Sequence, residues 1–195
     1  MRRRVIAGAC LSLAALVRAS TVALPLDKPY LWASNADGGD APSVCAAEPH
    51  AGRPALRFVY TNRRGYGNSL LEGVSVPPDA YGLRFNLFVE SAIPEAAMHL
   101  WFRERDGDMW MSRITPVDGR GLAAATNVWR EVFVPFSELA HQPRGDKRRQ
   151  FLSSDRLLIG FNFGDMAVRV SGLAFVVRAN GPPPSDSRAP APVCA

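Results

Sequence analysis

The sequence predicts an all-β protein, a jelly-roll β-sandwich of two antiparallel sheets. Short segments in which apolar and polar residues alternate recur along most of the chain, and this period of two is typical of strands with one buried face. Sixteen glycines and sixteen prolines separate these segments at spacings of roughly 8–12 residues, and no segment keeps a helical period. Hydrophobic residues make up 47% of the chain, which is enough for a packed core.

Nine segments carry the strand pattern, and from them we expect seven to nine strands. They are residues 24–32, 55–61, 69–76, 81–90, 98–105, 109–114, 129–135, 157–163 and 168–178. The third ends at Pro77-Pro78, because proline cannot donate to a sheet ladder. The last is expected to contain a β-bulge at Ser171-Gly172.

The segments between these strands are predicted to be surface loops. Residues 33–53 are rich in Gly, Pro, Asp and Ala and are expected to form one long loop that contains Cys45. Residues 115–127 and 141–150 are expected to be loops, and residues 137–139 a short helical turn.

The strands at 81–90 and 98–105 carry the candidate ligand-binding face. Their alternate positions hold aliphatic and phenylalanine side chains for the core, and the positions between them are polar or aromatic. If the two strands pair, these polar and aromatic side chains share one sheet face. With contributions from two further strands, the predicted ligand-binding residues are Arg84, Asn86, Phe88, His99, Trp101, Arg103, Trp110 and Asn162.

The chemistry of this face favours a carbohydrate ligand. Sugars present apolar C–H faces and a rim of hydroxyls, so flat aromatic rings and planar hydrogen-bonding groups bind them. Trp101 supplies the ring, and its Arg, Asn and His neighbours supply donors and acceptors. The alternatives are structural: a loop could cover Trp101 and make it part of a second core, Trp110 could cap the sandwich edge, and the arginines could be solvated charges.

The first 23 residues have the layout of a secretory signal peptide. Three arginines follow Met1, residues 5–17 are uncharged and rich in Ala and Leu, and Ala19 and Ala23 end two candidate cleavage motifs. A membrane span needs about 20 apolar residues, so we favour cleavage over a retained anchor. The predicted organisation is a signal peptide at 1–23, a sandwich domain at 24–179 and a Pro-rich tail at 180–195, in a secreted or periplasmic protein.

Charge and cysteine usage restrict the partners further. The formal net charge is +5, but residues 1–23 carry four arginines and no acid, so the remaining chain is close to neutral at +1. Nucleic acid is therefore not an expected partner. Cys45 and Cys194 are the only cysteines after residue 23, and in an oxidising compartment we expect them to form a disulfide, with two free thiols as the alternative.

Several motifs, taken in order, resemble those of galactose-binding-like β-sandwiches. They are Gly52-Arg-Pro-Ala-Leu-Arg-Phe58, Tyr81-Gly-Leu-Arg-Phe85, Trp129-Arg-Glu-Val-Phe-Val-Pro-Phe136 and Asp155-Arg-Leu-Leu-Ile-Gly-Phe161. Over residues 52–178 the chain is similar to carbohydrate-binding modules of families eleven and thirty, and to the complex I intermediate-associated assembly-factor domain. The resemblance implies a jelly-roll fold and gives Trp129 a packing role.

Domains of this type often hold a structural calcium ion between acids near the first and last strands. Here Ser171 stands where an aspartate is often found, and Asp27 could serve at the first strand. The ligand set is incomplete, so we expect no cofactor and no metal.

Together these observations predict an exported, non-catalytic carbohydrate-binding module that recognises a poly- or oligosaccharide on a concave sheet face. The nucleophile-elbow, zincin, P-loop and dinucleotide motifs are missing from the sequence, so catalysis is not expected. Two alternatives remain open. One is a protein-interaction or assembly module that uses the same face, and the other is a polysaccharide-active hydrolase or lyase with Glu90, Glu104 and Glu131 as candidate carboxylates.

Overall fold

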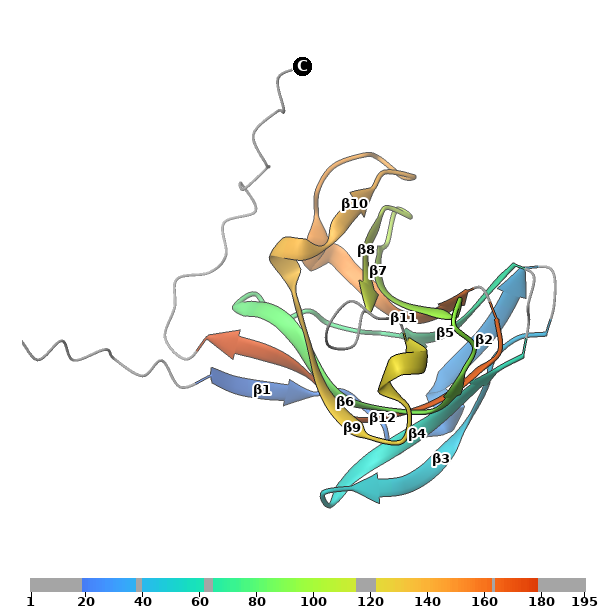
Figure 1. Ribbon diagram of the computed structural model, residues 1–195. Helices are drawn as coiled ribbons and strands as arrows, with labels where there is room; N and C mark the ends of the chain where they lie inside the picture. Colours follow the sequence, from blue (N-terminus) through green and yellow to red (C-terminus); the bar gives the residue numbers. More distant parts are fainter. Residues whose placement is uncertain (1–18, 38–39, 62–64, 115–121, 163, 179–195) are drawn as a thin grey trace, which may run out of the picture.

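A computed structural model describes residues 19–37, 40–61, 65–114, 122–162 and 164–178. Two antiparallel six-stranded sheets pack face to face, which confirms the predicted fold class (Figure 1). Sheet A has the order β3-β4-β12-β6-β9 with β1 beside β12, and comprises β1 (Ala19–Ala23), β3 (Ser43–His50), β4 (Arg53–Tyr60), β6 (Ala80–Ala92), β9 (Trp129–Pro135) and β12 (Met166–Arg178).

Sheet B has the order β10-β8-β7-β11-β5-β2. It comprises β2 (Trp32–Asp37), β5 (Tyr66–Glu72), β7 (Ala97–Glu104), β8 (Met109–Ile114), β10 (Ala140–Gln142) and β11 (Ser154–Asn162). Four short 3-10 turns complete the described elements: η1 (Pro29–Leu31), η2 (Leu122–Ala125), η3 (Phe136–Glu138) and η4 (Phe151–Ser153). Within the described residues, no helix is long and apolar enough to cross a membrane.

The alternating pattern decides which face of each strand is buried. Phe85 on β6 and Phe102 on β7 point between the sheets and are almost fully buried, and Phe161 and Phe175 join them from β11 and β12. Burying a side chain of this size contributes about 1.5–3 kcal/mol relative to leaving it in water. The core therefore fixes which residues of each strand remain on the two outer faces.

Eight of the nine predicted strands are present, but the described residues form twelve strands instead of seven to nine, and the loops predicted at 33–53 and 141–150 both contain strand residues. Residues 33–53 contain β2 and β3 instead of a continuous loop, and residues 24–31 contain η1 instead of a strand. β2 and β3 are the edge strands of their sheets, and β3 buries none of its side chains fully. An edge strand with little burial lacks the alternation on which the prediction relied.

The expected pairing of the strands at 81–90 and 98–105 is also wrong. β6 pairs with β12 and β9 in sheet A, whereas β7 pairs with β11 and β8 in sheet B. The turn at 93–96, which contains Pro94, carries the chain from one sheet to the other. The two strands therefore face each other across the core, and their polar residues lie on opposite surfaces of the molecule.

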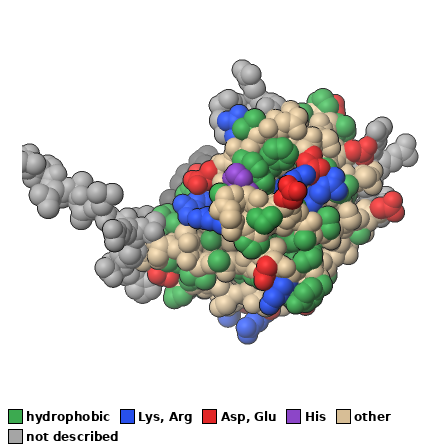
Figure 2. All heavy atoms as spheres, turned by 90° about the horizontal axis from the view of Figure 1, so that it is seen from below, with side chains coloured by type: hydrophobic (Ala, Val, Ile, Leu, Met, Phe, Trp, Pro, Cys, Tyr) green, Lys and Arg blue, Asp and Glu red, His purple; other side chains and the backbone are tan. Residues whose placement is uncertain are grey.

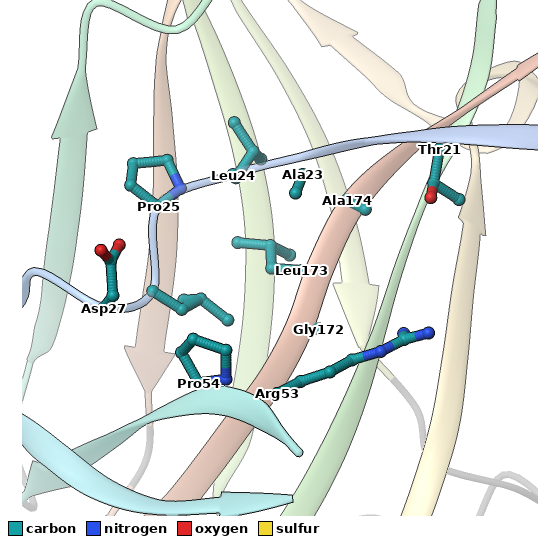
Figure 3. A pocket seen from close by; sticks show the side chains of 11 residues that line it. Thr21, Ala23, Leu24, Pro25, Asp27, Arg53, Pro54, Gly172, Leu173 and Ala174 are labelled. Atoms are coloured by element: carbon teal, nitrogen blue, oxygen red, sulfur yellow. The ribbon is translucent and has the colours of Figure 1, made fainter. Parts of the chain in front are cut away.

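One edge of β12 pairs with two strands placed end to end. Its residues 166–171 pair with β4, and residues 174–178 pair with β1, which lies beside the red end of β12 (Figure 1). The predicted bulge is confirmed between them, where Gly172 has φ +65°, a conformation that glycine adopts without strain. A pocket of about 560 Å³ occupies the gap between β1 and β4 (Figure 3).

Some predictions lie outside the described residues. These are the signal peptide up to residue 18, the Pro-rich tail at 180–195, and Cys194. Cys45 is exposed on β3 and forms no disulfide within the described part of the chain. Its pairing with Cys194 stays a prediction.

Candidate functional site

The outer face of sheet B carries a line of polar residues across five strands. The antiparallel register aligns Arg113 on β8, His99 on β7, Gly160 on β11, Asn68 on β5 and Asn35 on β2. We call this line the polar row. Since neighbouring strands lie about 4.8 Å apart, the polar row is about 19 Å long.

An apolar row runs beside the polar row on the same face. Two residues further along each strand, the register aligns Met111, Trp101, Leu158, Leu70 and Ala33. Two residues of a strand cover about 7 Å, so a ligand across the strands can contact both rows. The face thus has an apolar band with one large aromatic ring and a parallel band of hydrogen-bonding groups.

Gly160 leaves a gap in the polar row between His99 and Asn68. A Cβ atom at this position would lie 3.2 Å from Nε1 of Trp101, closer than most side-chain contacts. Glycine therefore lets the edge of the indole lie against β11. Although they are on the outer face of the sheet, His99 and Asn68 are only 9% and 8% exposed, so neighbouring atoms cover most of both side chains.

Three buried polar atoms around this gap have no hydrogen-bond partner within the described residues. They are Nε1 of Trp101, Nδ1 of His99 and Oδ1 of Asn68. A buried polar group without a partner costs about 1–3 kcal/mol, and folded proteins rarely leave several together. The indole N–H is a donor, the amide oxygen is an acceptor, and the imidazole nitrogen serves as either. The three atoms have almost no accessible surface, so a ligand with several hydroxyls would pair with them only after moving the side chains that cover them.

His99 gives this face a testable pH dependence. Burial, followed by the nearby charge of Arg113, lowers the pKa of His99 from its usual value of 6.5. As the pH falls, His99 is therefore protonated at a higher pH in the unfolded chain than in the folded protein. The contribution of His99 to the free energy of unfolding is complete above about pH 6.5 and is lost as the pH falls toward the lowered pKa. Between pH 7 and pH 5 we expect the free energy of unfolding, measured in urea, to fall more steeply for the wild type than for His99→Gln. Parallel curves for the two proteins would contradict this assignment.

The predicted residues of β6 lie on the other surface of the molecule. Arg84, Asn86 and Phe88 are half-buried on the outer face of sheet A, together with Trp129 from β9. Figure 2 shows the molecule from below Figure 1, the side on which β3, β4, β9 and β12 lie, with acidic and basic side chains next to one another.

On the outer face of sheet A several functional groups are paired among themselves. Glu90 accepts hydrogen bonds from Arg57 at 2.9 and 3.0 Å and from Arg169, and Arg57 above all lowers the pKa of Glu90. The Arg169 guanidinium lies 5.7 Å from the centre of the Phe88 ring. Trp129 stacks on His50, with 4.0 Å between ring centres and 15° between planes. Of the predicted residues on this face, Arg84 and Asn86 have no hydrogen-bond or ion-pair partner within the described part of the chain, whereas Phe88 and Trp129 are engaged with their neighbours.

The remaining predicted residues divide between surface and interior. Arg103 is exposed on β7 beside Trp101, and Asn162 lies on the same outer face of sheet B opposite Tyr66, which is 42% exposed. Trp110 instead points inward: its Nε1 donates to Glu104 and its ring packs against the Phe151 ring. The structure thus brings His99, Trp101, Arg103 and Asn162 onto one face.

Sequence reasoning missed Asn68, Gly160 and Arg113. Arg113 follows the alternation of its predicted strand, so its outward direction was readable from the sequence, whereas Asn68 lies just before the strand predicted at 69–76. Their alignment with His99 depends on β11, which pairs with both β5 and β7. No local pattern predicts this order of strands.

An acidic cluster lies at the turn between β7 and β8. Carboxylate oxygens of Glu104, Asp106 and Asp108 lie within 4.8 Å of one another. Asp108 Oδ1 accepts from the backbone N–H groups of Arg144 and Gly145, and Asp106 Oδ2 accepts from that of Asp146 at 2.9 Å. Because these hydrogen bonds tie Asp106 and Asp108 to residues 144–146, we assign the cluster to holding the 144–150 loop against β7.

Glu104 is the buried member of this cluster. It is 0% exposed and accepts from Trp110 Nε1, the Gln150 backbone N–H and the Ser153 hydroxyl. Burial raises its pKa, and these hydrogen bonds oppose the rise. Glu90 and Glu131 lie on sheet A, so the three carboxylates considered for an enzyme do not face one another in one cleft.

The place expected for calcium does not provide a calcium ligand set. The pocket between β1 and β4 has Asp27 as the one acid among its described lining residues, and Arg53 extends past Gly172 in the same pocket (Figure 3). The Ser171 hydroxyl donates to the carbonyl oxygens of Arg53 and Pro54. Calcium requires six to eight oxygen ligands, and one carboxylate beside a guanidinium does not meet this need.

Solved carbohydrate-binding modules share this fold. The family 11 module from Clostridium thermocellum, in complex with a β-1,3-1,4-mixed-linked tetrasaccharide, aligns with a TM-score of 0.60 and 16% identity over 77% of this chain and 91% of that chain. The family 11 module of a cellulosomal cellulase from the same organism aligns with a TM-score of 0.61 and 14% identity over 85% of this chain and 98% of that chain. The protein has the two-sheet β-sandwich fold of these modules.

At these identities, the likeness establishes the fold and not the ligand. A family 30 module also aligns, at 14% identity over 75% of this chain and 91% of that chain, with a TM-score of 0.47. No protein-family model and no curated protein matches the sequence. The resemblance to family eleven is thus confirmed for the fold, and the resemblance to the complex I assembly-factor domain stays a prediction.

Proposed function

We propose that this protein is a carbohydrate-binding module that holds an oligosaccharide across the strands of sheet B. The observation that carries the proposal is the group of three unpartnered polar atoms around Gly160, from Trp101, His99 and Asn68. A protein surface with no ligand would have little reason to keep a donor and an acceptor buried and unpaired beside an aromatic ring. Sugar hydroxyls both donate and accept, so an oligosaccharide that displaces the side chains covering these atoms can pair with them.

The two rows define how the sugar chain lies. The Trp101 ring and its apolar neighbours Leu158 and Leu70 contact the C–H faces of the sugar rings. The polar row hydrogen-bonds to the hydroxyls along one side of the chain. Both rows cross the strands, so the oligosaccharide also runs across the strands and passes over the Gly160 gap.

Sheet A is the less suitable face. Its aromatic Trp129 is already stacked on His50, and its arginines at 57 and 169 already bind Glu90. A ligand on that face would have to break these contacts before it formed its own. On sheet B the corresponding groups have no partner to lose.

A β-linked glucan is the first ligand to test. The structurally similar family 11 module binds a β-1,3-1,4-mixed-linked tetrasaccharide. We also propose that the module acts outside the cytoplasm after removal of its signal peptide, because residues 1–23 have the features of an export signal.

An NMR titration tests the site directly. The chain has four tryptophans, and so four indole N–H signals, and Trp101→Phe identifies the Trp101 signal by its disappearance. When the mixed-linked tetrasaccharide is added to the ¹⁵N-labelled protein, we expect the Trp101 signal to move most, because its N–H gains an acceptor. The Trp110 N–H already donates to Glu104 and serves as an internal control. Movement of the Trp129 signal alone would move the site to sheet A and refute the proposal.

A further inference from the structure

We infer that the glycan held on sheet B is acidic, with the carboxylate of a uronic acid unit bound by Arg113. This inference rests on the proposed function, because it names the class of sugar that the same face selects. It starts from the arginines of sheet B, which are placed differently from those of sheet A.

Arg113 stands at one end of the polar row. It lies directly opposite His99 on the neighbouring strand, and its side chain is exposed. Within the described residues it has no acidic partner. A second exposed arginine without an acidic partner in the described chain, Arg103, lies two residues from Trp101 on the same strand and face. Two arginines without an acidic partner therefore lie on the same face as Trp101. Of these, Arg113 belongs to the polar row, whereas the Arg103 guanidinium lies near Gly107 in the β7–β8 turn.

Three other arginines of the two sheets are neutralised by acidic side chains. Arg57 and Arg169 both form ion pairs with Glu90 on sheet A. The nitrogen–oxygen distance from Arg57 to Glu90 is 2.8 Å. Arg156, near the start of β11 in sheet B, lies 3.5 Å from Glu72 on the neighbouring strand β5. The chain after residue 23 is nearly neutral at +1, so the two unpaired charges on the same face as Trp101 form a local excess on an otherwise balanced protein.

A guanidinium is suited to a carboxylate. Its planar array of donors matches the two carboxylate oxygens, and such charged pairs are stronger than neutral hydrogen bonds. The carboxylate of a uronic acid projects from the edge of the sugar ring. The register places Gly160 two strand spacings from Arg113, about 10 Å, a distance that the long Arg113 side chain and a carboxylate on the edge of a sugar ring span together.

A matched pair of ligands tests the inference. Cellotetraose and the β-1,4-linked tetraglucuronate differ only at C6, which is a hydroxymethyl group in the first and a carboxylate in the second. At low ionic strength we expect calorimetry to show about tenfold tighter binding of the tetraglucuronate, as a charged hydrogen-bonded pair provides. The difference should shrink as salt is added, because the Arg113 pair is exposed.

Two arginine variants locate the effect. Arg113→Gln should reduce the preference for the tetraglucuronate to near one. Arg105→Gln removes the same charge from the β7–β8 turn, where the side chain is 81% exposed, and should leave the preference intact.

The outcomes separate this inference from the proposed function. The acidic specificity is refuted if the wild type binds both ligands equally, or if Arg113→Gln keeps the preference for the tetraglucuronate. In either case, loss of binding of both ligands by Trp101→Ala would still support the glycan site. If neither ligand binds in a way that depends on Trp101, both the inference and the proposed function fail.

Discussion

Replacement of Trp101 by alanine is expected to weaken binding of the mixed-linked tetrasaccharide at least about 30-fold. The change removes the one large ring of the apolar row and an unpaired N–H donor beside the Gly160 gap. An aromatic side chain at the centre of a binding surface typically contributes about 2 kcal/mol or more, which corresponds to this ratio. Isothermal titration calorimetry measures the change, and circular dichroism checks that the variant is folded.

The matched control makes the same substitution on the opposite face. Trp129→Ala removes an indole from the outer face of sheet A, where it stacks on His50, and should bind the tetrasaccharide as the wild type does. Loss of binding by Trp129→Ala with retention by Trp101→Ala would place the ligand on sheet A. Equal loss in both variants would indicate that the assay reports folding instead of the site.

Replacement of Glu104 by alanine is expected to lower the free energy of unfolding by about 3 kcal/mol or more. The buried carboxylate accepts hydrogen bonds from Trp110, Gln150 and Ser153, and alanine leaves all three donors without it. Each buried donor without a partner costs about 1–3 kcal/mol. Urea unfolding followed by tryptophan fluorescence measures the loss.

The isosteric variant separates the hydrogen bonds from the volume. Glu104→Gln keeps one acceptor oxygen and nearly the same shape, so its destabilisation should be about half that of Glu104→Ala or less. Because Glu104 lies beneath sheet B and away from the polar row, folded Glu104→Gln should bind glycan normally. A fully stable Glu104→Ala would show that the 144–153 segment does not depend on this carboxylate.

The alternation of residues was enough to predict which side chains are buried, but not which strands are neighbours. Phe85 and Phe102 were expected in the core and are there. The expected sharing of one face by Asn86 and Trp101 was wrong, because their strands belong to different sheets. The two-residue alternation indicates which side chains of a strand face the core. The pairing of strands depends instead on contacts between residues that are distant in sequence.

The candidate site shows the same limit. Trp101 and His99 were predicted from their own strand, since both alternate with core residues on β7. Asn68 and Gly160 join them only because β11 lies between β5 and β7, with Gly160 opposite both Asn68 and His99. Gly160 matters because the absence of a side chain leaves room for the edge of the Trp101 indole. No composition or spacing rule predicts such a position.

The pairing of β1 with β12 makes the two candidate cleavage sites unequal. Cleavage after Ala19 would keep residues 20–23 in register with β12, whereas cleavage after Ala23 would remove the strand. The side chains of residues 20–23 are exposed, so the second cut would leave the core intact and uncover a row of unpaired backbone groups along residues 174–178. Such an open edge accepts an extended segment from another polypeptide. If the signal peptide is removed as proposed, the position of the cut would thus decide whether the domain is self-contained or able to join its sheet to another chain.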